Sequence, residues 1–162
     1  FGQSSVSERL SFLIIGDLSF FYDMNSLRIK HIRNNVRILL INNHGGNEFY
    51  QQPIRPTTDN SIGAKHNNTA QGWAQSVGFK YISAQTEEEY ISQIPELVKP
   101  ESDNPVLFEV FTEQMTDVQA LRTVQRSIIG LFDKSAALKN AARSVIGESG
   151  VRTIKNIFSK KH

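Results

Sequence analysis

Short apolar runs, each followed by polar residues or glycine, dominate the first two-thirds of the chain. The first two of these runs are Phe12–Ile15 and Val36–Ile41, the second of which is interrupted by one arginine. Continuous apolar runs of this length are typical of strands that are buried on both faces of a parallel sheet. We therefore predict a fully buried strand at residues 9–15 and a second one at residues 36–41.

Between these strands the apolar residues recur at roughly helical spacing, so we predict a helix there. Two strands joined by a helix form a parallel βαβ unit, which is almost always right-handed. The same patterns predict strands at residues 79–83 and 106–111, a helix at 69–77, and a helix that begins at Thr86 and is ended or kinked by Pro95. The residues that carry the first helical spacing are Phe20, Phe21, Met24, Leu27 and Ile32.

Strands that alternate with helices predict an α/β fold with three layers, in which a mostly parallel sheet carries helices on both faces. Residues 51–68 are polar and contain two prolines, so we expect a long surface loop there. From about residue 117 to 158 the pattern is again helical. We place the α/β domain at residues 1–127 and a basic, amphipathic helical extension at residues 128–162.

Composition narrows the class of protein. The chain has 162 residues, of which 39% are hydrophobic and none is cysteine. This length suits one domain, and the lack of cysteine excludes disulfides, zinc–thiolate sites, iron–sulfur clusters and a cysteine nucleophile. The apolar runs are far shorter than the roughly 20 residues needed to span a bilayer, so we expect a soluble, cytoplasmic protein. Because the chain starts at Phe1 without a signal pattern, we expect a piece of something longer.

Charge is distributed unevenly along the chain. The net charge of +2 divides into +5 from Asp133 to the C-terminus and −3 over the rest. The basic, amphipathic tail is expected to pack on the domain or on an adjacent subunit. Contact with a membrane surface or a nucleic acid is the alternative that such a pattern allows, but no nucleic-acid motif supports it. We expect neither partner.

Polar residues follow the first two predicted strands, where candidate chemistry is concentrated. Asp17 and Asn43 fall at the carboxyl ends of strands joined by one helix, and ligands of parallel sheets bind at such ends. A carboxylate, an amide oxygen and a backbone carbonyl of the Gly45-Gly46 turn suit Mg²⁺ that also holds phosphate and water. The backbone amides of Leu18 and Ser19 would then face phosphate oxygens. The alternative is that the aspartate is only a helix N-cap and the asparagines are only a turn.

Together these residues resemble a known motif. The pairs Gly16-Asp17 and Asn42-Asn43 resemble the diphosphate-binding motif of thiamine-diphosphate enzymes, which begins Gly-Asp-Gly and ends Asn-Asn. The run from Gly16 to Leu27, in which Leu18 replaces the third glycine, resembles the menaquinone-pathway synthase family. Those enzymes join 2-oxoglutarate to isochorismate with loss of CO₂. The resemblance covers roughly residues 10–115.

The resemblance implies a thiamine-diphosphate-binding fold whose cofactors are thiamine diphosphate and Mg²⁺. It implies that Asp17 and Asn43 bind the metal through their side chains and that Gly45 binds it through its carbonyl oxygen. Phe49 matches an apolar residue over the active site of the synthase. The cofactor-binding set that the resemblance implies is Gly16, Asp17, Leu18, Ser19, Asn43, Gly45, Gly46 and Phe49.

Two residues depart from the family pattern. Glu48 and Gln52 stand where the synthase usually presents apolar side chains, so the acceptor substrate stays open. His44 lies inside the motif turn, where a structural turn residue is favoured over a proton donor to the substrate. No catalytic residue is assigned with certainty, and His44 and Glu48 are the candidates. For His66, which lies between the polar loop and a helix, a structural role is again favoured.

The resemblance implies the C-terminal, cofactor-binding domain of an enzyme that decarboxylates a 2-oxo acid and ligates the product to an acceptor. In that family the glutamate that activates the cofactor lies on the pyrimidine-binding domain of another subunit, and no residue here matches it. We therefore expect the chain to be inactive alone and its full-length form to be a homodimer or homotetramer. The alternative is a non-catalytic relative that serves as an interaction or structural subunit.

Overall fold

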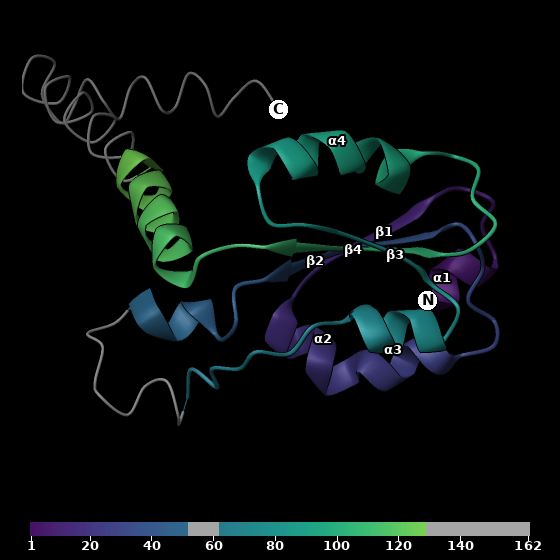
Figure 1. Cartoon of the computed structure of the whole chain (residues 1–162), viewed down its shortest axis with the longest axis horizontal. Coiled ribbons are helices and arrows are strands. Elements are labelled where there is room, and N and C mark those ends of the chain that lie inside the picture. Colours follow the sequence, from purple (N-terminus) through teal and green to yellow (C-terminus); the bar gives the residue numbers. More distant parts are fainter. Residues whose placement is uncertain (52–61, 129–162) are drawn as a thin grey trace, which may run out of the picture. The chain divides into compact units, whose positions relative to one another are not determined.

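The computed structural model describes residues 1–51 and 62–128 of the chain. The chain divides into two units, Phe1–Gln119 and Ala120–His162. The first unit contains every labelled element of Figure 1. A further helix begins at residue 114 and continues to residue 128. The elements are α1 (Gly2–Ser5), β1 (Ser11–Gly16), α2 (Asp17–Asp23), the 3₁₀ helix η1 (Met24–Arg28), β2 (Val36–Asn42), the 3₁₀ helix η2 (Asn47–Gln51), α3 (Gln71–Ser76), β3 (Lys80–Ala84), α4 (Glu87–Val98) and β4 (Val106–Phe111).

The four described strands form one sheet in the order β1-β2-β4-β3, and every pair is parallel. The chain moves across the sheet in one direction from β1 to β3 and then returns to β4. Since parallel crossovers are right-handed, a return crossover must cover the opposite face. Figure 1 shows this arrangement, with α2 and α3 on one face and α4 on the other. The predicted three-layer α/β fold with a parallel sheet is confirmed.

Each face of the sheet carries its own hydrophobic core, because neighbouring residues of a strand point to opposite faces. Ile38 and Leu40 of β2 belong to the core under α2 and α3, whereas Leu39 packs against the core under α4. Tyr90 of α4 stacks on Phe108 of β4, with ring centroids 5.7 Å apart. The first core contains Phe20, Leu27, Val36, Ile38, Leu40, Ala70, Ala74, Phe79 and Leu107, and the second contains Ala84, Leu97, Val106 and Phe108.

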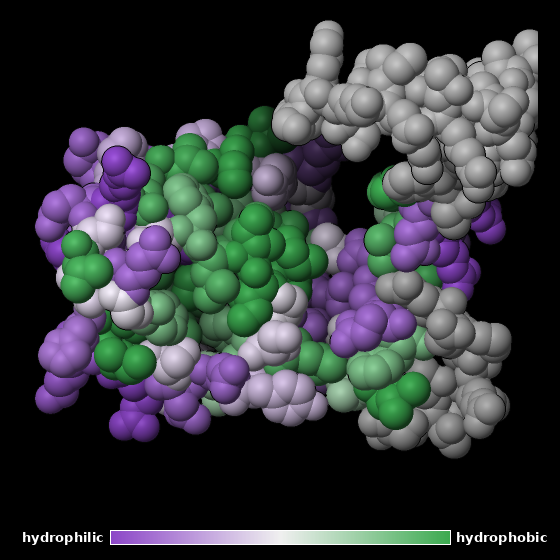
Figure 2. All heavy atoms as spheres, turned by 180° about the vertical axis from the view of Figure 1, so that it is seen from behind, coloured by the Kyte–Doolittle hydropathy of each residue, from purple (hydrophilic) through white to green (hydrophobic). Residues whose placement is uncertain are grey.

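The prediction that the first strand is fully buried is wrong. β1 pairs with β2 and forms an end of the described sheet, and Phe12, Leu13 and Ile14 are 54%, 39% and 73% exposed. Figure 2, which views the chain from behind, shows a broad hydrophobic area on this side. An apolar run predicts a strand, but the strand's position in the sheet decides whether that strand is covered. The hydrophobic pattern of the sequence does not show where a strand lies in the sheet.

Two helices have other limits than the sequence predicts. The predicted helical spacing extends to Ile32, whereas α2 starts at Asp17 and continues as a 3₁₀ helix that ends at Arg28, so Ile32 lies beyond it. Pro95 is predicted to end or to kink the helix that begins after Thr86, and the first alternative is wrong because α4 continues to Val98. Proline inside a helix removes one backbone donor, but α4 also buries Leu97 in the second core, with Tyr90 and Ile94 packed beside it.

The predicted C-terminal tail and the predicted surface loop lie partly outside the described residues. Of the predicted tail, residues 129–162 are outside the described residues, and so are residues 52–61 of the predicted loop. The division at residues 127 and 128 stays a prediction. Within the described part, no helix is both long and apolar enough to cross a bilayer.

Candidate functional site

The residues predicted to form the site come from the carboxyl ends of two neighbouring strands. In the register of the sheet Gly16 of β1 lies beside Ile41 of β2, so the residues that follow both strands leave the same edge. The backbone N–H of Gly45 donates a hydrogen bond to Oδ2 of Asp17 over 3.0 Å. The structure thus brings together the two ends of the motif, as parallel pairing requires.

Asp17 is almost completely buried, with 2% of its surface exposed. Its Oδ1 accepts a hydrogen bond from the backbone N–H of Leu18 over 2.6 Å. Nε2 of His66 lies 3.3 Å from Oδ2, without the alignment of a hydrogen bond. The N-cap of α2 is Gly16 rather than Asp17, so capping does not explain the aspartate. A buried carboxylate is costly unless hydrogen bonds or a cation compensate its charge.

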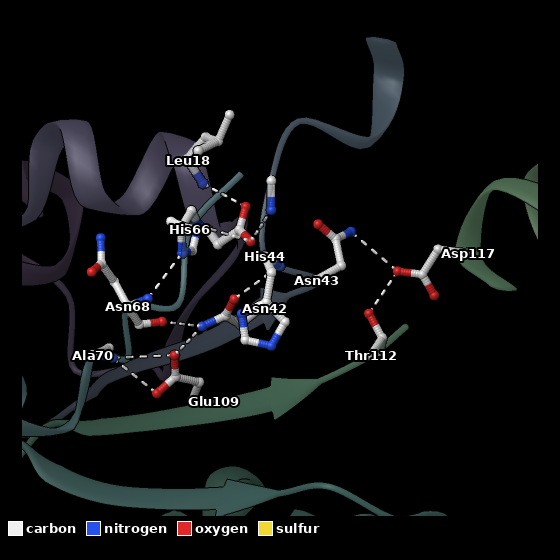
Figure 3. Close-up of polar contacts among 12 residues, drawn as sticks. Leu18, Asn42, Asn43, His44, His66, Asn68, Ala70, Glu109, Thr112 and Asp117 are labelled. Carbon is white, nitrogen blue, oxygen red and sulfur yellow. Dashed lines mark hydrogen bonds and ion pairs between the residues drawn. The ribbon is translucent and has the colours of Figure 1, made fainter. Parts of the chain in front are cut away.

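Asn43 presents an unsatisfied acceptor. Its Nδ2 donates a hydrogen bond to Oδ2 of Asp117 over 3.1 Å, whereas its buried Oδ1 has no hydrogen-bond partner. In Figure 3 the amide nitrogen of Asn43 points toward Asp117 and the oxygen points away from it. Leaving a buried acceptor unpaired costs about 1–3 kcal/mol. A free amide oxygen and a buried carboxylate are hard oxygen donors, so the residues present fit Mg²⁺.

Asn42 has a different role from its neighbour. Its Nδ2 donates to Oε1 of Glu109 over 2.7 Å and to the backbone carbonyl of Asn68 over 2.9 Å. Its Oδ1 accepts from the backbone N–H of His44 over 3.2 Å. Both ends of this amide are therefore used inside the protein (Figure 3), and Asn42 joins the turn after β2 to two other segments.

His44 occupies the turn itself, with a φ of 66° in the left-handed region. Its carbonyl oxygen accepts a hydrogen bond from the backbone N–H of His66 over 3.0 Å. Its ring stacks on Phe111 with centroids 6.0 Å apart and lies 6.0 Å from the ring of His66. Nδ1 of His44 is buried and has no hydrogen-bond partner. The imidazole of His44 is thus held by ring contacts, and the backbone of His44 connects two loops.

The two glycines of the turn have no space for a side chain. A Cβ at Gly45 would lie 2.8 Å from the carbonyl oxygen of Gly63, a backbone atom. A Cβ at Gly46 would lie 2.6 Å from the ring of Phe49 and 3.2 Å from Leu18. The N–H of Gly46 donates to the same Gly63 oxygen over 2.8 Å. Glycine at both positions lets the turn, the following loop and the phenyl ring approach closely.

Four of the predicted site residues lie at the surface, and Gly16 at the end of β1 is one of them. Ser19 and Glu48 are exposed, and Phe49, which packs on Gly46, is 36% exposed. Gln52 lies outside the described residues. The geometry therefore joins Asp17, Leu18, Gly45, Gly46 and Phe49 through direct contacts, and places Asn43 in the same turn, but it leaves Glu48 at the periphery.

Sequence reasoning missed two carboxylates that organise the turn. Glu109 of β4 is fully buried and accepts hydrogen bonds from Asn42, from the backbone N–H of Ala70 and from the hydroxyl of Tyr81. Asp117 accepts one hydrogen bond from Asn43 and one from the hydroxyl of Thr112. A single acidic residue within the apolar run of β4 was a signal for the first. The second lies in an ordinary polar stretch, and no local signal distinguishes it.

Comparison with known proteins identifies relatives that are similar to the chain in sequence. The enzyme 2-succinyl-5-enolpyruvyl-6-hydroxy-3-cyclohexene-1-carboxylate synthase of Phocaeicola vulgatus is 43% identical to the chain over 125 residues. Its counterparts in Bacteroides thetaiotaomicron and Bacteroides fragilis are 41% and 40% identical over the same length. The chain is a homologue of these synthases. No protein-family model matches it.

The homology covers 75% of the chain but 22% of each of these three synthases. The chain therefore spans about a fifth of the length of the curated relatives it matches. The resemblance predicted from the Gly16-Asp17 and Asn42-Asn43 pairs is confirmed at this level.

Proposed function

We propose that this chain is the diphosphate- and Mg²⁺-binding part of a thiamine-diphosphate-dependent enzyme that acts on a 2-oxo acid. The observation that carries the proposal is the unpartnered, buried Oδ1 of Asn43 in the turn whose Gly45 N–H binds the buried carboxylate of Asp17. Homology to synthases of the same reaction family supports it. The reaction type we propose is decarboxylation followed by carboligation.

Within this proposal Asp17 and Asn43 hold Mg²⁺ through side-chain oxygens, and Gly45 holds it through its carbonyl. Mg²⁺ keeps water and substrate phosphate oxygens in its remaining positions, which suits a diphosphate. When bound, thiamine diphosphate supplies the electron sink for decarboxylation of the 2-oxo acid. Burial of Asp17 strengthens its attraction for a divalent cation, because water screens the charge less there than at the surface.

The proposal extends to the partners of the chain. We propose that the activating glutamate comes from the pyrimidine-binding domain of a second subunit in a homodimer or homotetramer, and that this chain alone turns over no 2-oxo acid. The acceptor is left open, since Glu48, where the resemblance implies an apolar residue, is an exposed carboxylate. Cofactor-dependent turnover of a 2-oxo acid by the 162-residue chain alone would contradict the proposal that the activating glutamate comes from another domain.

Calorimetry on the full-length protein tests the binding proposal. We expect thiamine diphosphate to bind when Mg²⁺ is present and not when it is chelated. Asp17→Ala should abolish the Mg²⁺-dependent binding, because the ion would lose its one anionic ligand from this chain. Asp23→Ala is the matched control, since Asp23 is an exposed carboxylate at the end of the same helix. Unchanged affinity in Asp17→Ala would contradict the metal assignment, and no binding by the wild type would favour the non-catalytic alternative.

A further inference from the structure

Asp117 lies near the start of the helix that follows β4, within the first unit of the chain. Its Oδ2 accepts hydrogen bonds from Oγ1 of Thr112 over 2.6 Å and from Nδ2 of Asn43 over 3.1 Å. Nδ2 of Asn47 lies at a longer 3.5 Å from the same oxygen. Three donors from two separate segments thus meet at one carboxylate oxygen.

The end of β4 holds this carboxylate in place. The hydroxyl of Thr112 donates to Asp117, while the backbone N–H of Thr112 donates to the carbonyl oxygen of Asn42 over 3.0 Å. Thr112 therefore ties the aspartate to the last residue of β2, one position before Asn43. The distance between the carboxylate and the Asn43 side chain is then determined by the pairing of β2 with β4.

An ionised carboxylate determines which way the amide of Asn43 faces. A carboxylate can only accept hydrogen bonds, so the NH₂ group of the amide must face it. Reversing the amide would set two oxygens against each other and break a charge-assisted hydrogen bond. The oxygen of Asn43 consequently points away from Asp117, where it is buried and unpartnered (Figure 3). Asn42, in contrast, uses both ends of its amide for contacts inside the protein.

We infer that Asp117 is a positioning residue: it orients the side-chain amide of Asn43 so that Oδ1 is presented to the cation before the cation binds. The inference rests on the proposed function for its ligand, Mg²⁺ with thiamine diphosphate. Without Asp117 the amide has two orientations, and one of them turns a positively polarised NH₂ group toward the ion. Partners that orient a metal ligand in this way typically account for about 10–100-fold of metal affinity.

Mg²⁺ titration of the full-length protein in the presence of thiamine diphosphate compares three variants. We expect Asp117→Ala to weaken Mg²⁺ binding by about 10–100-fold. Asp117→Asn should restore most of the affinity, because its carbonyl oxygen still accepts from the NH₂ group of Asn43. Glu113→Gln is the matched control, since Glu113 is an exposed carboxylate four positions earlier that binds Thr116 instead of Asn43. Its affinity should equal that of the wild type.

A spectroscopic measurement on the 162-residue chain reads the orientation directly, without cofactor or activity. In ¹⁵N-resolved NMR the NH₂ protons of Asn43 should be shifted downfield by the carboxylate in the wild type. The shift should disappear in Asp117→Ala and persist in Glu113→Gln. The amide spectrum of the remaining residues shows whether each variant is folded, so a loss of structure is separated from a loss of orientation.

Several outcomes overturn the inference. Wild-type Mg²⁺ affinity in a folded Asp117→Ala variant would show that the contact does not position the ligand. Equal losses in Asp117→Ala and Asp117→Asn would assign the effect to charge and not to orientation. If the wild type binds no Mg²⁺ and thiamine diphosphate while the Asn43 shift still depends on Asp117, the proposed function fails and the contact is only structural.

Discussion

Gly45 shows how one residue can be required by its neighbours and not by its own backbone angles. Its N–H binds the carboxylate of Asp17, and the space where a Cβ would lie is occupied by the carbonyl oxygen of Gly63. A carbonyl oxygen belongs to the backbone and cannot rotate away as a side chain can. Any larger residue must therefore move either the turn or the loop that contains Gly63.

We expect Gly45→Ala to lower the free energy of unfolding by about 1–3 kcal/mol, as overpacking usually does, and to weaken Mg²⁺-dependent cofactor binding. Gly72→Ala is the matched control, because Gly72 lies in α3 with open space around its Cβ position. Alanine there should stabilise the protein by up to about 1 kcal/mol through its higher helix propensity. Urea unfolding measures both, and a Gly45→Ala variant as stable as the wild type would contradict the contact with Gly63.

Glu109 connects four elements of the fold. It lies on β4, accepts hydrogen bonds from Asn42 at the end of β2 and from Tyr81 on β3, and accepts from the backbone N–H of Ala70, the N-cap of α3. Negative charge at the N-terminus of a helix is favourable. A charge inside an apolar strand is therefore compensated by donors from each neighbouring element, which fixes the start of α3 beside the turn after β2.

The hydroxyl of Tyr81 makes this connection sensitive to alkaline pH. Burial, followed by the hydrogen bond to Glu109 and the negative charge of that carboxylate, raises the pKa of Tyr81. The folded protein therefore keeps this proton at pH values where an unfolded tyrosine, with a pKa of about 10, has lost it. The stabilisation is fully present below the unfolded pKa and is lost as the pH rises above it.

We expect the free energy of unfolding to fall as the pH rises above about 10, and Tyr81→Phe to remove part of that fall. At neutral pH the same variant should cost about 1 kcal/mol, because Glu109 loses one donor. Tyr90→Phe is the control, since Tyr90 stacks on Phe108 on the other face of the sheet. Chemical denaturation at a series of pH values measures both effects. Identical alkaline profiles for wild type and Tyr81→Phe would rule out this coupling.

At the scale of the whole molecule, β1 forms one end of the sheet in the part of the chain that the structure describes. β1 exposes Phe12, Leu13 and Ile14 in succession, and neighbouring residues of a strand point to opposite faces, so apolar side chains lie on both faces of this strand. Edge strands in soluble proteins usually carry charges or prolines that prevent pairing with other chains. β1 (Ser11–Gly16) contains neither, so nothing in its sequence opposes pairing with another strand.

We expect the 162-residue chain to self-associate through β1 and Ile14→Lys to reduce the association, because a charged side chain on the edge opposes pairing. Ile91→Lys is the matched control, since Ile91 is also an exposed isoleucine, 60% accessible, but lies on α4. Sedimentation velocity over a range of concentrations measures the effect. A strictly monomeric wild type, or an equal reduction by both variants, would contradict the role of β1.

Much of the fold could be predicted from local patterns. The strand at residues 106–111 is found with the predicted bounds, and the helix after Thr86 starts where its hydroxyl accepts from the backbone N–H of Glu89. Those signals depend on residues a few positions apart, so one sequence suffices to detect them. The exposure of β1 could not be predicted, since it depends on which strands lie beside it in the sheet.

The sequence by itself determined the succession of strands and helices, the parallel α/β class and the polar residues at the ends of the first two strands. These properties follow from hydrophobic periodicity and from the fact that parallel strands end at one edge. Only the tertiary structure decided that Asn42 is engaged at both ends of its amide while Asn43 keeps a free oxygen. That difference depends on Glu109 and Asp117, which lie 67 and 74 positions away in the chain and reach the turn only through the pairing of β2 with β4.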